Sequence, residues 1–197
     1  MYYGIKMKKI LLVIILLSVA SADYNPKYFD KKKKDCENQS AIACYFVGRM
    51  YENGRHTKQD NFKALKYYKK SCNGGYQSGC HNVGVFYNEG RGVKQNIFKA
   101  NEYYSKACSS NYAPSCHNLG ISYDKGIGVR QDPFKAVKFY TKACNDSMGN
   151  ACFNLGIMYY NGEGVRQDFN KAKELFGKAC DEKVSAGCAE YSKLNRR

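Results

Sequence analysis

The chain has 197 residues, ten cysteines, no tryptophan and a formal net charge of +15. Its length suits one elongated domain. The charge favours acidic partners or an anionic surface. However, lysines such as Lys63, Lys99 and Lys135 recur at positions expected to face solvent, and no nucleic-acid-binding module is recognisable. We therefore expect no nucleic-acid partner.

Residues 1–22 have the pattern of a secretory signal peptide. Three lysines precede an apolar run at residues 10–17, and residues 20–22 form a small-residue cleavage site. An uncleaved anchor is the weaker alternative, because the run is short for a span of about 20 residues. We expect cleavage before Asp23, a net charge of +12 after three lysines are removed, and no membrane span in the remainder. The protein should then be secreted or periplasmic.

The cysteines recur at a constant period. Members of a pair are eight residues apart and successive pairs are 36 apart, and rows of glycine, tyrosine and alanine share the period. A period of this length predicts a solenoid, in which each supersecondary unit covers the apolar face of its neighbour. The cysteines are Cys36, Cys44, Cys72, Cys80, Cys108, Cys116, Cys144, Cys152, Cys180 and Cys188.

Each unit is expected to begin with a helix. Cys80, Val83, Gly84 and Tyr87 are spaced so that they share one face of such a helix. The helix should end at the glycine-containing turn of residues 88–92, because glycine permits the positive φ that follows many helices.

A second helix should follow in each unit. It is predicted to begin at Asn96, a good N-cap, and to carry a broad apolar stripe through Phe98, Ala100 and Tyr104. Small residues such as Gly84 and Ala100 should let aromatic side chains interlock between helices, which assigns most tyrosines to the core.

These units imply a domain organisation. Polar, lysine-rich ends should cap the stack and stop further repeats from adding to it. We expect a capping helix at residues 23–35 and a solenoid at 36–197, with repeats at about 40–75, 76–111, 112–147 and 148–183 and a capping helix at 184–197.

The cysteine pairs are predicted to form disulfides. An even number in an exported chain favours them, and the spacing matches no common zinc motif. Eight residues of continuous helix would separate two Cα atoms by about 12 Å, beyond the roughly 4.4–6.8 Å that a disulfide allows, so the chain must turn between partners. Pairing across the longer gaps would leave Cys36 and Cys188 alone. Each bond should therefore join a second helix to the next first helix.

The units resemble Sel-one-like repeats. Residues 116–144 contain Cys-x-Asn-Leu-Gly-x-x-Tyr, then Gly-x-Gly-Val-x-Gln-Asp, then Lys-Ala and Lys-Ala-Cys. With its export signal and paired cysteines, the chain is similar to the Helicobacter cysteine-rich protein family from Cys36 onward. The resemblance implies an all-α fold, a right-handed α/α superhelix related to tetratricopeptide repeats, with five inter-repeat disulfides. The first unit departs from the pattern at Phe46, His56 and Thr57.

The resemblance also implies penicillin-binding or β-lactamase activity and contact with host proteins. A serine β-lactamase needs a nucleophile beside a base, usually in S-x-x-K, with S-D-N and K-T-G elsewhere. Ser122 and Lys125 match the first motif, but the other two are absent, and Ser122 aligns with Met50, Phe86 and Met158. No catalytic residue is predicted.

Metal and cofactor sites are not predicted either. The chain has three histidines, of which His81 and His117 occupy equivalent positions on successive first helices. These should lie about 10 Å apart, too far to share a metal ion. We interpret the histidines as surface residues. No phosphate-binding loop or dinucleotide fingerprint occurs, so no cofactor is expected.

A binding groove has more support from the residues. Asn82, Asn118 and Asn154 should project from the first helices opposite the core, on the concave side of such a superhelix. A row of amides can donate to and accept from the backbone of an extended peptide. In the alternative interpretation, each asparagine ties its own loop to the next repeat. The groove candidates are Asn82, Asn118, Asn154, Tyr45, His81, His117 and Phe153.

We therefore expect a monomeric, disulfide-clamped solenoid that binds a protein or peptide, such as a host factor or an acidic protein, in its concave groove. The alternative function is a penicillin-binding protein with weak β-lactamase activity, for which the ligands would be β-lactams or cell-wall peptides. A structural scaffold of the cell envelope is a third open possibility.

Overall fold

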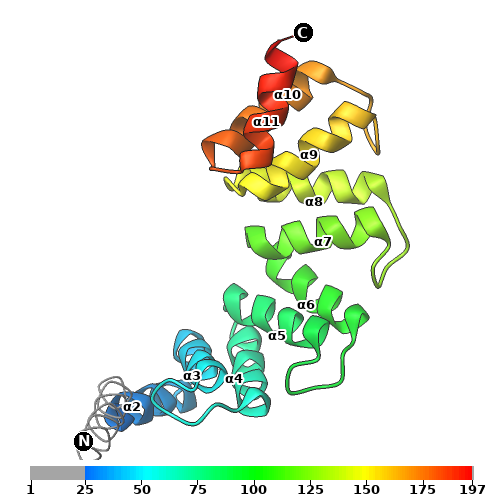
Figure 1. Ribbon diagram of the computed structural model, residues 1–197. Helices are drawn as coiled ribbons and strands as arrows, with labels where there is room; N and C mark the ends of the chain where they lie inside the picture. The colour runs from blue at the N-terminus through cyan, green and yellow to red at the C-terminus, as the bar shows by residue number, and fades with distance from the viewer. Residues whose placement is uncertain (1–24, 197) are drawn as a thin grey trace, which may run out of the picture.

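The computed structural model describes residues 25–196, and this part of the chain folds into ten α-helices without a β-strand. The helices stack as an elongated arc with α2 and α11 at opposite ends (Figure 1). The predicted solenoid of helical repeats is therefore confirmed, whereas the expected signal peptide lies outside the described residues. The helices are α2 (Pro26–Glu37), α3 (Ala41–Asn53), α4 (Asn61–Asn73), α5 (Gln77–Glu89), α6 (Ile97–Ser109), α7 (Ala113–Lys125), α8 (Pro133–Asn145), α9 (Gly149–Asn161), α10 (Phe169–Asp181) and α11 (Ser185–Asn195).

Helix ends follow the sequence signals. Asp132 accepts a hydrogen bond from the backbone N–H of Lys135 at 3.0 Å, and its equivalents cap α4, α6 and α10 in the same way. Gly90 ends α5 with a φ of 73°, and the glycines after α3, α7 and α9 are also left-handed. A glutamine then fixes each loop, as Gln95 does by donating to the carbonyl of Asn88 at 2.7 Å.

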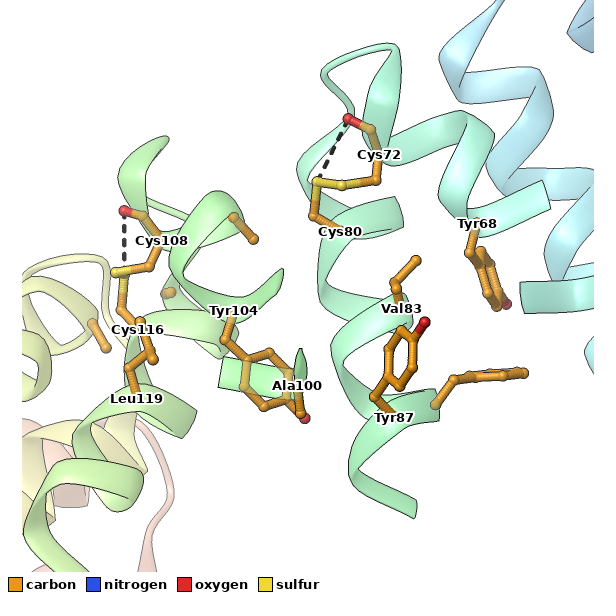
Figure 2. Packing of buried hydrophobic residues seen from close by; sticks show 14 of the residues in the cluster. Tyr68, Cys72, Cys80, Val83, Tyr87, Ala100, Tyr104, Cys108, Cys116 and Leu119 are labelled. Carbon is orange, nitrogen blue, oxygen red and sulfur yellow. Dashed lines mark hydrogen bonds between the residues drawn. A yellow bond between two sulfur atoms is a disulfide. The ribbon is translucent and has the colours of Figure 1, made fainter. Parts of the chain in front are cut away.

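Aromatic rings fill the space beside the helical glycines. A β-carbon on Gly84 of α5 would lie 2.5 Å from the ring of Tyr104 on α6. Figure 2 shows this tyrosine beside Ala100, between the disulfides at either end of the repeat. The predicted interlocking of small and aromatic residues is confirmed, and it recurs as Gly48 with Tyr68, Gly120 with Tyr140 and Gly156 with Phe176.

Five disulfides join the repeats, as predicted. Each connects the end of an even-numbered helix to the start of the next odd-numbered one, with Cα atoms 4.4 to 4.8 Å apart. The turn inside each bridge contains one residue with positive φ, and only one of the five is a glycine. These residues are Gln39, Gly75, Asn111, Ser147 and Lys183.

One part of the predicted apolar stripe is wrong. The side chain of Phe98 is 69% exposed, and Phe62 and Phe134 at equivalent positions are 71% and 74% exposed. Positions two residues apart on a helix differ by a rotation of about 200°, so Phe98 lies nearly opposite the buried Ala100. The second helices therefore bury a narrower face than the composition indicates.

Within residues 25–196, the helices are all too short or too polar to cross a membrane.

Candidate functional site

The first helices of successive repeats contact one another directly. His81 on α5 is hydrogen-bonded to the hydroxyl of Ser115 on α7, at 2.9 Å from Nδ1. The amide of Asn154 on α9 donates to Nε2 of His117 on α7, at 3.2 Å. The helices α5, α7 and α9 thus share one surface along the stack. We call it the inner face and define it by two rows of side chains, Asn82, Asn118 and Asn154 in one and Val85, Ile121 and Ile157 in the other.

The asparagine row is half-buried and links neighbouring repeats. Asn118 is hydrogen-bonded to the hydroxyl of Tyr104, and burial raises the pKa of that tyrosine to about 12. Asn82 makes the same bond to Tyr68, and Asn154 to Tyr140. The asparagines thus tie repeats together, but through a tyrosine of the preceding repeat. One hydroxyl uses only part of the hydrogen-bonding capacity of an amide, which has two donors and two lone pairs.

The aliphatic row lies three residues after the asparagines, almost one helical turn away. Ile157 is 36% exposed, whereas Val85 and Ile121 are half-buried. We did not predict this row from the sequence. Its signal was present, because an apolar residue recurs at a position that shares a helix face with the polar asparagines.

The interpretation of the histidines as surface residues is wrong for two of them. His81 packs against the rings of Tyr104 and Tyr112, and burial lowers its pKa to about 4. His117 packs against Tyr140, and burial lowers its pKa as well. Both imidazoles are therefore neutral at pH 7 and act in packing between repeats.

Tyr45 and Phe153 occupy the same position in their repeats as the two histidines. The ring of Tyr45 contacts Tyr68 and Tyr76, and that of Phe153 contacts Phe176. Both side chains are half-buried.

A charged cluster joins the first two repeats. One carboxylate oxygen of Glu52 accepts from the Arg91 guanidinium at 2.7 Å, and the other is hydrogen-bonded to the hydroxyl of Tyr68. Burial, reinforced by Glu52, raises the pKa of Tyr68 well above its usual value. The phenol therefore stays protonated and keeps its bonds to Glu52 and Asn82.

The S-x-x-K motif does not place its serine beside its lysine. Ser122 is 6% exposed, and its hydroxyl donates to the side chain of Asn101 at 2.8 Å. Asn101 in turn donates to the carbonyl of Ile127 at 2.8 Å. The Lys125 side chain is 66% exposed and is paired with Asp124 at 3.1 Å. Ser122 thus belongs to a buried polar link, and this arrangement provides no activated nucleophile.

Among the described residues, no group of three or more histidines, cysteines, aspartates or glutamates is placed to hold a metal ion.

Comparison with known proteins identifies the repeats. The family model described as Sel1 repeat matches residues 41–76, 77–112, 113–147 and 149–184. Helicobacter pylori cysteine rich protein B is 33% identical, with a TM-score of 0.53, over 66% of this chain and 94% of that one. No curated protein matches the chain by sequence.

Two further solved structures share the fold. A protective antigen of uropathogenic Escherichia coli with an SLR fold is 27% identical, with a TM-score of 0.84, over 87% of this chain. The chain spans only 37% of that protein. A Sel1 repeat protein from Oxalobacter formigenes is 23% identical, with a TM-score of 0.73, over 86% of this chain and 74% of that one.

Proposed function

Because the chain belongs to the Sel1 repeat family, in the disulfide-bridged group of Helicobacter cysteine-rich protein B, we propose that it binds an extended segment of a partner protein along the inner face. The observation that carries this proposal is the pair of rows that repeats on α5, α7 and α9. In each of these three repeats, the amide can form hydrogen bonds with the peptide backbone, and the aliphatic side chain beside it can contact the peptide side chains.

Rigidity supports this proposal. The disulfides hold each second helix to the next first helix, and the asparagine–tyrosine bonds cross the same boundaries. A surface that is already ordered loses little conformational entropy when a ligand binds, which favours affinity.

Charge and cysteine chemistry support a proposal for the location and the partner. The cysteines of the described residues are all in disulfides, which are typical of secreted and periplasmic proteins. With a net charge of +12 once the expected signal peptide and its three lysines are removed, the protein should attract acidic partners over longer distances. We propose an exported protein with a protein ligand outside the cytoplasm. The Escherichia coli neighbour is described as a protective antigen, which agrees with that location.

The test selects phage-displayed random peptides on the oxidised protein and compares two triple variants. Asn82→Ala, Asn118→Ala and Asn154→Ala together remove the amides from the inner face. The control, Tyr68→Phe, Tyr104→Phe and Tyr140→Phe, removes the three asparagine–tyrosine bonds and the bond from Tyr68 to Glu52, but keeps the amides and the bond between Asn154 and His117.

We expect the asparagine variant to lose affinity for the selected peptides by about tenfold or more, equivalent to about 1.4 kcal/mol, while the tyrosine variant retains most of it. Equal affinity in the asparagine variant and the native protein would contradict a role for the amides.

A further inference from the structure

Three residues at which the first unit departs from the repeat pattern line one cleft. Phe46 stands in the asparagine row, Arg49 stands in the aliphatic row, and His56 replaces a glycine of the loop. All three line a cleft of about 440 Å³ between α3 and the start of α2, where Tyr28 forms another wall. The cleft therefore lies at the N-terminal end of the inner face.

His56 stands where the other repeats have a glycine that leaves no room for a side chain. A β-carbon on Gly92, its equivalent, would lie 2.6 Å from the backbone of Asn61 in the preceding second helix. His56 itself has a φ of 63°, which is strained for a non-glycine residue. Its Nδ1 accepts a hydrogen bond from the backbone N–H of Asn25 at 3.1 Å, and its ring packs edge-on against Tyr28. The histidine thus shapes the cleft by holding α2 against the loop.

Basic residues line the cleft. Its described lining includes Arg49 and Arg55 but no aspartate or glutamate. The Lys32 ammonium lies 5.7 Å from the ring centroid of Tyr28 and 5.9 Å from that of Phe46, against two of the walls. Aromatic walls with nearby cations suit a ligand that has a carboxylate next to an apolar group.

We infer that this cleft binds such a carboxylate, with the apolar group between Tyr28 and Phe46 and the carboxylate at Arg49. The inference deepens the proposed function, because the carboxylate would belong to the segment that lies along the inner face. It could come from the end of a peptide or from an acidic side chain beside an aromatic one. In either case the cleft would fix the register of the segment, because no other described repeat has this combination of residues.

The test is an NMR titration of the oxidised protein with N-acetylphenylalanine, N-acetylphenylalaninamide and the amidated, acetylated dipeptide Glu-Phe. The amide probe lacks a carboxylate, and the dipeptide has one only on its side chain. We expect shifts confined to amides of α2, α3 and the loop at residues 54–60, and about tenfold weaker binding of the amide probe than of at least one acid. The stronger of the two acids identifies the source of the carboxylate.

Two variants and one control separate recognition from a structural role. Phe46→Asn and Arg49→Gln should each weaken binding of the preferred acid by about fivefold or more. Arg130→Gln, which removes an exposed cation elsewhere, should leave it unchanged. The inference would be overturned by equal binding of the acid and amide probes, by an absence of chemical-shift changes, or by equal effects of Arg49→Gln and Arg130→Gln. The unusual residues of the first unit would then serve only to cap the end of the fold. Because these probes do not reach the asparagine row, failure here is distinguishable from failure of the inner-face proposal.

Discussion

The side chain of Asn118 on α7 is hydrogen-bonded to the hydroxyl of Tyr104 on α6, across the boundary between two repeats. The same tyrosine ring covers Gly84 on α5, so one residue of α6 contacts both neighbouring helices. This arrangement connects stability to the proposed function, because an amide of the inner face also holds two repeats together.

Tyr104→Phe and Asn118→Ala should each lower the free energy of unfolding by about 1 kcal/mol, because each breaks the same bond. The double variant should lose less than the sum of the two single variants, since the bond can be lost only once. Urea unfolding of the four proteins in the cycle measures this coupling. Strictly additive losses would show that the bond does not contribute to stability.

Gly84→Ala should lower the free energy of unfolding by about 1–3 kcal/mol, because the new methyl group meets the ring of Tyr104. Phe98→Ala is the control. This change removes a far larger side chain, but the ring is 69% exposed, so the loss should stay within about 0.5 kcal/mol. Thermal unfolding under oxidising conditions compares the two, and a greater loss from Phe98→Ala would contradict the packing described here.

The features that the 36-residue period determines, including the disulfides between repeats, were predictable, whereas the side-chain hydrogen bonds between repeats were not. Cysteine spacing was sufficient to predict the disulfides, and the alignment of Gly84 with other helical glycines predicted close aromatic packing. The bond between Asn118 and Tyr104 joins two helices whose relative rotation no local pattern specifies. Phe98 was misplaced because its apolar character outweighed its angular position on the helix.

Two other features had no usable sequence signal. Left-handed backbone is usually marked by glycine, yet Lys183 adopts it inside the last disulfide turn with a φ of 63°. Polar residues usually indicate exposure, yet Ser122 and Asn101 are buried, because Ser122 donates to Asn101 and Asn101 donates to the carbonyl of Ile127.

Stability should fall as the pH drops from about 6.5 towards 4, because burial keeps His81 neutral in the native state. The unfolded chain binds a proton near pH 6.5, whereas the native histidine, with a pKa of about 4, does not. The stabilisation is therefore complete above pH 6.5 and is lost on acidification by about 1 kcal/mol per pH unit. The lowered pKa of His117 acts in the same direction.

Urea unfolding between pH 7 and pH 5 measures this slope above the range in which carboxylates titrate. The variant with both His81→Phe and His117→Phe is the comparison, since Phe153 already occupies the equivalent position in a later repeat. Its stability should change much less over this interval. An unchanged slope would assign the pH dependence to other groups.

The central claim, that a partner segment lies along the inner face, is tested most directly by locating a bound peptide. A selected peptide with a nitroxide label at its middle residue is added to protein with labelled methyl groups, and methyl signals broadened by the nitroxide are recorded. We predict broadening of Val85, Ile121 and Ile157. Val129 lines a different cleft, together with Phe98 and Phe134. Broadening of Val129 with Val85, Ile121 and Ile157 unaffected would contradict the account.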